Sequence, residues 1–573
     1  MPRHRFARIA SAAVVSLLLL RPAAASEPVA AGARPSPALG AFLAGTVAGN
    51  LGDDARAAGF MAEAQRSDPN DPRLRHTAFM FAALSGTPDA AALAAGVKPD
   101  LLSILVLANA AAQNGDWNRA ATLFAALPAD PLVAAIGPLL SAWAQFGAGN
   151  ADAAIATLSN CRGPLAGTCL LNAGTVAELA RRDAQADALY SRTESEFGLA
   201  SLAALQTAGS FLVRHGRAAD ADAMLDALVR RVPVLGMVRG GLQASLARPA
   251  VGSAADGLAR AYLGIAELLR ETGGDNGKVA AGFMLRFALV MQPGLAPAHL
   301  TLAELQAAAK HPAEAAATLR DVDPADPLFP IAELRTATLD AMLGQRDAAI
   351  ARLRALSDRL PDRPEPAESL GDVLSDARDW PGAIAAYDRA ITDQRRLEHG
   401  HLAGDDWRLL FARAVAFDRS DRWPQARLDL EAALSLAPAE PFVLNYLGYS
   451  MVERRDDLPK ARVLIQRALA AKPDDGSIRD SLGWAMLRQD DVPGAVRTLE
   501  RAAEQDPEDP TVNFHLGAAY WAAGRRIEAE DQWRWALVLH PDADAEKQIR
   551  DALARAEHAG GRGPGNAPGN PAP

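Results

Sequence analysis

A pattern of small and large residues repeats every 34 positions near the end of this 573-residue chain. Each copy has a Leu-Gly pair, a large residue, an alanine, a second large residue, another alanine and then a proline. The two clearest copies run from Gly483 to Pro507 and from Gly517 to Pro541. A unit of this length holds two short helices, which cannot bury their apolar sides alone. The pattern therefore predicts helix pairs stacked in a row.

The order and spacing of these residues resemble the tetratricopeptide repeat (TPR), a pair of antiparallel helices. Weaker copies continue the frame into the N-terminal half. The resemblance implies an all-α chain, a right-handed solenoid of about fourteen helix pairs. Composition agrees, because apolar residues make up 49% of the chain and aromatic residues only 5%. Alanine and leucine then supply most of the apolar surface, which suits closely packed helices.

Small residues are expected where the two helices of a pair cross, because a larger side chain there would push them apart. A proline is expected just after each second helix, since it lacks an N–H group and disfavours helix in the residue before it. The predicted structural positions are Gly371, Ala414, Gly448, Gly483 and Gly517 in first helices, Ala461, Ala495 and Ala529 in second helices, and Pro473, Pro507 and Pro541 after them.

Breaks in the frame suggest a domain organisation with two arrays joined by a linker. Glycines and a proline at 234–253 predict the linker. A nine-residue insertion around 394–404 interrupts the second array. The expected segments are a disordered stretch at 26–37, a degenerate TPR array at 38–233, a second array at 254–541, a capping helix at 542–558 and a disordered tail at 559–573.

Residues 1–25 have the pattern of a secretory signal peptide. Three arginines precede an apolar run from Ile9 to Leu20, and Ala23–Ala25 supplies small residues for cleavage. The alternative is an uncleaved anchor, although the run is shorter than the roughly 20 residues that span a bilayer. No cysteine follows the run, so we do not expect a lipoprotein. The predicted location is the periplasm, without a membrane span after cleavage.

The two cysteines, Cys161 and Cys169, are eight positions apart. In an oxidising compartment a disulfide between them is plausible, and closing so short a loop would contribute roughly 2.5 kcal/mol on the chain-entropy model. The alternative is a pair of small buried apolar side chains. Neither interpretation makes the cysteines catalytic.

Charge and motifs exclude several classes of function. The net charge of −10 would become about −14 after loss of four arginines with the signal peptide, which argues against nucleic acid and anionic membranes. No HExxH, GxSxG or CxxC motif is present, and the stretch 272–279 lacks the first glycine and the hydroxyl residue of a P-loop. His399 and His401, with Asp405 and Asp406 nearby, lack helical ligand spacing and are interpreted as a polar loop. We therefore expect no enzyme activity, metal, cofactor or small-molecule substrate.

In the general TPR pattern, the first helix of each pair lines a concave groove. Residues three before, one after and four after the small residue point into it. Near the C-terminus these positions carry aromatic residues and few charges, which fits a groove for apolar side chains of a protein partner. The alternative is that the rings pack sideways between neighbouring pairs. The predicted partner-binding residues are Arg408, Phe411, Asn445, Tyr449, Asp480, Trp484, Phe514 and Trp521.

One known TPR use is not expected. Co-chaperone TPR domains hold a terminal carboxylate with paired lysine and asparagine residues. Here Asn445 has no lysine companion, and Asp480 would repel a carboxylate.

Four segments carry a closer resemblance: Trp407–Arg413, Val443–Ser450, Asp480–Ala485 and His515–Trp521. They are similar to exported bacterial TPR proteins, and to outer-membrane TPR lipoproteins that act as adaptors for carboxyl-terminal processing proteases. The chain departs from those lipoproteins in lacking the lipid-carrying cysteine. The resemblance implies a non-enzymatic scaffold that binds one or more envelope proteins and presents clients to a protease. The alternative is a structural component of a secretion or exopolysaccharide machine.

Overall fold

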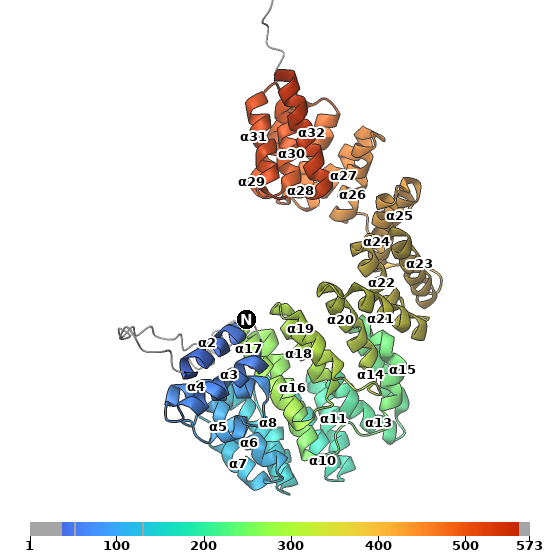
Figure 1. Ribbon diagram of the computed structural model, residues 1–573. Helices are drawn as coiled ribbons and strands as arrows, with labels where there is room; N and C mark the ends of the chain where they lie inside the picture. The colour runs from blue at the N-terminus through green and yellow to red at the C-terminus, as the bar shows by residue number, and fades with distance from the viewer. Residues whose placement is uncertain (1–36, 51–52, 129–130, 561–573) are drawn as a thin grey trace, which may run out of the picture. The chain divides into compact units, whose positions relative to one another are not determined.

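The computed structural model describes residues 37–50, 53–128 and 131–560. The predicted signal peptide at 1–25 lies outside this range, as do 26–36 and 561–573 of the predicted terminal segments. The described residues form two compact units: unit 1 ends at Leu360 and unit 2 begins at Pro361. Both are built from helices, without a strand in the described ranges. Figure 1 labels the helices.

Unit 1 contains the first twenty-two helical elements in the described part of the chain. These are α2 (Pro37–Asn50), α3 (Asp54–Ser67), α4 (Pro72–Ser85), α5 (Ala90–Ala94), α6 (Leu101–Gln113), α7 (Trp117–Ala125), α8 (Pro131–Gly147), α9 (Ala151–Ser159), α10 (Ala166–Leu179), α11 (Asp183–Phe197), α12 (Leu202–Ala204), η1 (Leu205–Gly209), α13 (Ser210–Arg214), α14 (Ala218–Arg231), η2 (Pro233–Val238), α15 (Arg239–Ser245), α16 (Ala254–Thr272), α17 (Gly274–Met291), α18 (Ala296–Ala308), α19 (Pro312–Arg320), α20 (Phe329–Met342) and α21 (Arg346–Arg359), where η1 joins α12 to α13 without a break.

Unit 2 continues the alternation of first and second helices. Its elements are α22 (Pro364–Asp376), α23 (Trp380–Leu397), η3 (Gly404–Asp406), α24 (Trp407–Arg419), α25 (Trp423–Leu436), α26 (Pro441–Glu453), α27 (Leu458–Ala471), α28 (Gly476–Arg488), α29 (Val492–Gln505), α30 (Pro510–Ala522), α31 (Arg526–Val538) and α32 (Ala543–Gly560).

Successive helices pack as pairs, and the described part of the chain holds fourteen such pairs when α12, η1 and α13 count as one helix. This confirms the predicted all-α repeat fold. The period is also visible in the elements, because α28 and α30 begin at Gly476 and Pro510, 34 residues apart.

Small residues lie at the crossings within pairs. A Cβ atom added at Gly483 would lie 2.5 Å from Leu499 Cγ, and one at Gly517 would lie 2.5 Å from Trp533. Real Cβ contacts are never this short, so only glycine lets α28 approach α29, and α30 approach α31, at this separation.

Local capping residues set where the helices begin. Asp475 accepts a hydrogen bond from the Ile478 amide at 3.0 Å at the start of α28, and Asp491 does the same for Gly494 at 3.1 Å at the start of α29. These side chains satisfy N–H groups that the first turn leaves without a partner. The second helices end before the predicted prolines: α27 ends at Ala471, two residues before Pro473.

The structure differs from the prediction at residues 234–253. In place of a linker, this stretch forms η2 and α15, and Leu235, Met237 and Leu242 are buried. The helices that follow, α16 and α17, pack against α8 and α4 of the earlier repeats (Figure 1), so one core continues across the stretch. Burial of the apolar side chains between the glycines stabilises these helices more than the conformational freedom of glycine destabilises them. The division between compact units falls after Leu360.

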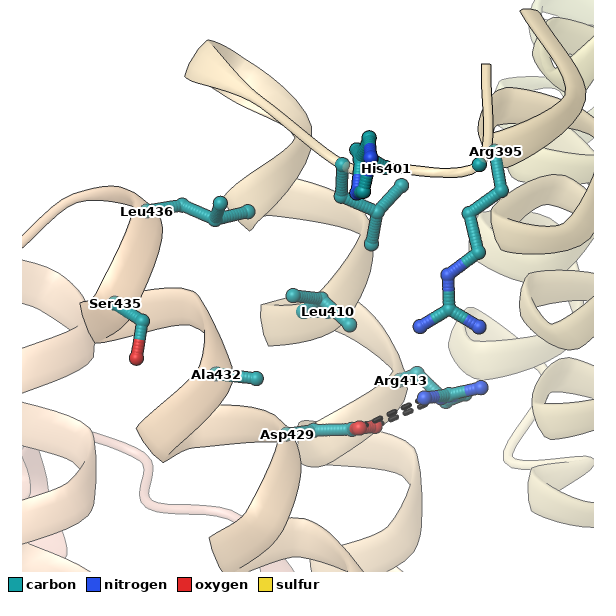
Figure 2. A pocket seen from close by; sticks show the side chains of 10 residues that line it. Arg395, His401, Leu410, Arg413, Asp429, Ala432, Ser435 and Leu436 are labelled. Carbon is teal, nitrogen blue, oxygen red and sulfur yellow. Dashed lines mark hydrogen bonds and ion pairs between the residues drawn. The ribbon is translucent and has the colours of Figure 1, made fainter. Parts of the chain in front are cut away.

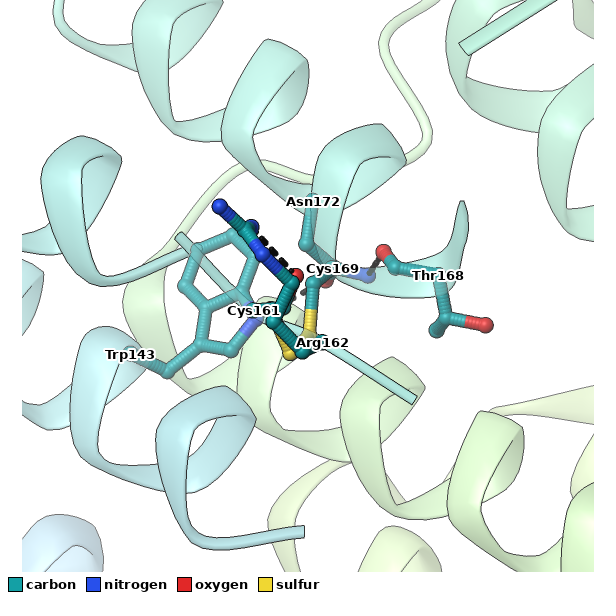
Figure 3. Close-up of a disulfide and its surroundings, with 6 residues drawn as sticks. All are labelled: Trp143, Cys161, Arg162, Thr168, Cys169 and Asn172. Atoms are coloured by element: carbon teal, nitrogen blue, oxygen red, sulfur yellow. Dashed lines mark hydrogen bonds between the residues drawn. A yellow bond between two sulfur atoms is a disulfide. The ribbon is translucent and has the colours of Figure 1, made fainter. Parts of the chain in front are cut away.

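In unit 1, a disulfide joins Cys161, in the connection between α9 and α10, to Cys169 in the first turn of α10 (Figure 3). Beside it, Trp143 Nε1 donates to Asn172 Oδ1 at 2.9 Å, and Asn172 Nδ2 donates to the Thr168 carbonyl at 2.7 Å. Of the two alternatives that the sequence leaves open, the structure has the bonded pair. The bond lies in a buried region, since Cys161 and Cys169 are both buried.

Among the helices of the described residues, none combines the length and the apolar character needed to cross a bilayer.

Candidate functional site

The first helices of unit 2 carry the residues that the sequence assigns to a partner. α26 packs beside α28, and α28 packs beside α30, so equivalent positions on these helices lie in neighbouring rows. Each first helix has one small residue at the crossing with its second helix. The residues three before, one after and four after that small residue form a surface that we call the first-helix face. Arg408 lies at its edge. Its reference residues are Gly371, Ala414, Gly448, Gly483 and Gly517.

Four of the predicted residues surround one side chain, His515 of α30. The Trp484 ring stacks on the His515 ring with centroids 4.1 Å apart and planes 14° apart. Phe514 and Tyr449 lie 5.7 and 6.4 Å from the same ring. His515 Nδ1 donates a hydrogen bond to Asp480 Oδ2 at 2.8 Å. We call these five residues the His515 cluster; it spans three consecutive first helices.

Two members of the His515 cluster are buried and three keep part of their surface exposed. His515 is 3% exposed and Asp480 is 5% exposed, whereas Tyr449, Trp484 and Phe514 are half-buried. The rings therefore pack between neighbouring pairs, as the alternative interpretation expects, and also present edges to solvent. Half-buried aromatic rings held in place by packing lose little conformational freedom when a partner covers them.

Charged groups border the His515 cluster. Trp484 Nε1 donates to Glu453 Oε1 at 2.6 Å, and the Arg488 guanidinium lies 5.6 Å from the Trp484 ring centroid. Burial, with the charges of Glu453 and Asp480 beside it, raises the pKa of the Tyr449 hydroxyl, which is neutral at physiological pH. Asp480 uses one oxygen for His515, and its Oδ1 has no hydrogen-bond partner in the described structure.

A second aromatic group lies between α24 and α26. The Phe411 ring meets the Tyr446 ring edge-on at 5.5 Å and lies 6.3 Å from the Trp407 ring. The Tyr446 hydroxyl donates to Asp418 at 2.9 Å. Arg408 is exposed, with its guanidinium 5.5 Å from the Trp407 ring. Phe411 and Arg408 are therefore neighbours, with contacts separate from those of the His515 cluster.

The two remaining predicted residues have other surroundings. Trp521 lies at the end of α30, 5.8 Å from Trp533 and 5.0 Å from the Arg526 guanidinium. Asn445 is half-buried on α26, and its Oδ1 is buried without a hydrogen-bond partner among the residues that the structure describes.

Sequence reasoning missed an acidic row on α22. The offsets that gave Asp480 and Trp484 from Gly483 also give Glu368 and Asp372 when counted from Gly371, so the signal was in the repeat frame. Glu365 and Asp376 extend the same side of α22, and we call these four carboxylates the acid row. Burial and the neighbouring charges of Asp372 and Glu365 raise the pKa of Glu368 to about 7. The first-helix face is thus acidic on α22 and aromatic from α24 onward.

His515 and Tyr446 were also missed, because they lie two positions before Gly517 and Gly448, outside the three offsets that define the first-helix face. No group of three or more potential metal ligands occurs in the described residues. His399 and His401 lie in the loop between α23 and α24, as the sequence indicates.

Comparison with known proteins identifies repeats over part of the chain. Residues 279–402 match the family described as a tetratricopeptide repeat-like domain, and residues 369–441 and 481–544 match the tetratricopeptide repeat family. The matched segments are therefore similar to tetratricopeptide repeats, and together they cover less than half of the chain. No curated protein matches the chain.

Solved structures share helical repeats with the chain at low similarity. A tetratricopeptide repeat protein from Parabacteroides merdae is 11% identical with a TM-score of 0.38, covering 45% of this chain and 97% of its own. The APC/C hetero-tetramer Cut9–Hcn1 is 14% identical with a TM-score of 0.37, covering 91% and 98%. YrrB, described as a TPR protein with an unusual peptide-binding site, is 18% identical with a TM-score of 0.27, covering 36% and 97%. Similarity with such low identities and TM-scores does not indicate a partner for this chain.

Proposed function

We propose that the chain is a non-enzymatic scaffold whose first-helix face in unit 2 binds a segment of another protein. The observation that carries the proposal is the His515 cluster, where three half-buried rings from consecutive repeats surround a buried Asp480–His515 pair. Aromatic residues held in place at a partly exposed surface are typical of residues that dominate protein-binding energy.

Charge supports a preference among partners. The acid row lies on α22, and Glu453 and Asp480 border the aromatic rings. A segment with apolar side chains and basic residues fits this surface, whereas an acidic segment would be repelled.

The cellular role that we propose is in the bacterial periplasm, as an adaptor that presents envelope proteins to a processing protease. The signal-peptide pattern of residues 1–25 and the family resemblance support this proposal, and a disulfide at Cys161–Cys169 fits an oxidising compartment. The second candidate is an assembly component of a secretion or exopolysaccharide machine. An adaptor changes the turnover of a protease; an assembly component co-purifies in fixed stoichiometry.

The test is an affinity purification from envelope extract with the wild-type chain and the Tyr449→Ala/Trp484→Ala variant. We expect the variant to remain helical by circular dichroism, because both rings are half-buried, and to lose its partner by at least tenfold. Trp535→Ala is the matched control, since Trp535 is an exposed ring on the second helix α31. Loss of helical signal in the double variant, or loss of the partner in the control, would contradict the proposal.

A further inference from the structure

The insertion between α23 and α24, which the repeat frame does not explain, forms one wall of a pocket in unit 2. The pocket has a volume of about 480 Å³, a size typical of ligand sites. It is lined by the end of α23 (Arg395), the insertion (Gly400, His401, Leu402), α24 (Leu410, Arg413) and α25 (Asp429, Ala432, Ser435, Leu436) (Figure 2).

One part of the lining is apolar. Leu402, Ala432 and Leu436 are partly buried and pack on the core of unit 2, and Leu410 belongs to that core. These side chains come from three different elements and offer an aliphatic surface. Burial of a short aliphatic group there would be favourable at about 25 cal/mol per Å².

Two arginines supply the polar part. Arg413 donates to both oxygens of Asp429 at 2.7 Å and to Asp388 at 2.6 Å. Burial opposes its charge, but these hydrogen bonds prevail and raise the pKa of Arg413, so the guanidinium stays charged. The Asp429 carboxylate is consequently satisfied within the protein.

Arg395 differs from Arg413. It is exposed at the end of α23, and its guanidinium, which points toward that of Arg413 in Figure 2, has no ion-pair partner among the described residues. Its neighbour Arg396 instead pairs with Asp393 at 2.9 Å. Asp429 and Asp388 offset the charge of Arg413, so the positive charge in this pocket that has no carboxylate partner among the described residues is that of Arg395. A lone guanidinium disfavours a cation beside it and favours an anion.

We propose that this pocket binds a carboxylate with a short aliphatic body, with Arg395 holding the carboxylate and the leucines holding the aliphatic group. Ser435, at the wall formed by α25, offers a further polar contact. The ligand is a free aliphatic acid or the terminal carboxylate of a peptide. This site is separate from the first-helix face and does not depend on the function proposed for it.

Calorimetric titration of the full chain tests the proposal with four probes: N-acetyl-leucine, its amide, and the peptide Ala-Ala-Ala-Leu with a free or an amidated C-terminus. We expect the free acids to bind at least tenfold more tightly than the amides. Binding of the N-acetyl amino acid and the peptide alike would identify the source as any aliphatic acid. Binding of the peptide alone would identify it as a chain terminus.

The variant Arg395→Ala should weaken binding of the acids at least tenfold, and Arg396→Ala, the adjacent arginine outside the pocket, should leave it unchanged. Both side chains are exposed, so both variants should fold. Equal binding of acids and amides, undiminished binding to Arg395→Ala, or no binding of either acid at millimolar concentration would overturn the proposal.

Discussion

At the scale of single residues, Gly483 shows how narrowly the repeat is specified. Its missing side chain leaves room for Leu499 of the next helix, since an added Cβ would lie 2.5 Å from Leu499 Cγ and 3.3 Å from the Leu499 backbone nitrogen. Gly483→Leu should destabilise unit 2 by roughly 1–3 kcal/mol, because the helices must move apart. Urea unfolding followed by tryptophan fluorescence measures this, since seven of the nine tryptophans belong to unit 2.

The matched control for Gly483→Leu is Ala470→Leu, which adds the same side chain at an exposed position of α27. It should change the free energy of unfolding by no more than about 0.5 kcal/mol. Equal unfolding midpoints for the two variants would mean that Gly483 is not at a crossing.

Glu368 gives the acid row a measurable pH dependence. Burial, with Asp372 and Glu365 nearby, raises its pKa to about 7 in the folded protein, against about 4.3 in an unfolded chain. The folded state therefore holds the proton more tightly, and the stability that this proton contributes is lost as pH rises through about 7. Glu368→Gln should stabilise unit 2 by about 1–3 kcal/mol at pH 8 and have little effect at pH 4.

The measurement for Glu368→Gln is urea unfolding at the two pH values, with the exposed Glu398→Gln as control. A benefit at pH 4 that disappears at pH 8 has the wrong sign for a raised pKa and would refute this account of the acid row.

At the scale of elements, the connection between α9 and α10 is the part of unit 1 closed by a disulfide. On the chain-entropy model, a bond with a sequence separation of 8 contributes roughly 2.5 kcal/mol. Cys161→Ala/Cys169→Ala should lower the free energy of unfolding by about that amount under oxidising conditions. With a reductant present throughout, wild type and variant should unfold alike. A variant as stable as the oxidised wild type would mean that the bond contributes nothing.

The helices were predicted best from the sequence where glycine and proline set their crossings and their ends. From α24 onward, each small residue and each proline marks a crossing or an end, and the helices follow the 34-residue frame. The stretch at 234–253 was predicted less well, because composition does not reveal that η2 and α15 bury Leu235 and Leu242 against other elements. Burial of that kind depends on partners far away in the sequence.

The candidate site shows the same division between local and distant information. Offsets from Gly448 and Gly483 led to Tyr449 and Trp484, because those positions depend on one helix. His515 was missed, because its role comes from Asp480 and Trp484, which belong to the preceding repeat. A pocket such as the one beside Arg395 depends on three elements and an insertion, and no repeat frame contains it.

At the scale of the whole molecule, the described residues form two compact helical units, and each unit has hydrophobic clusters of its own. In unit 1, one hydrophobic cluster contains Phe79 of α4 as well as Leu285 of α17, so repeats distant in sequence share a core. In unit 2, the clusters follow consecutive repeats. The proposed binding face lies on unit 2 alone, where its residues come from neighbouring first helices.

The proposed function requires that the first-helix face contacts a protein partner. The most direct test places the photo-crosslinking residue benzoylphenylalanine at Trp484 in one full-length chain and at Trp535 in another, followed by irradiation of cells and mass spectrometry. Both positions are aromatic, but Trp535 lies on a second helix. We expect a defined envelope protein to crosslink at position 484 and not at 535. Crosslinks at 535 without any at 484 would contradict the claim.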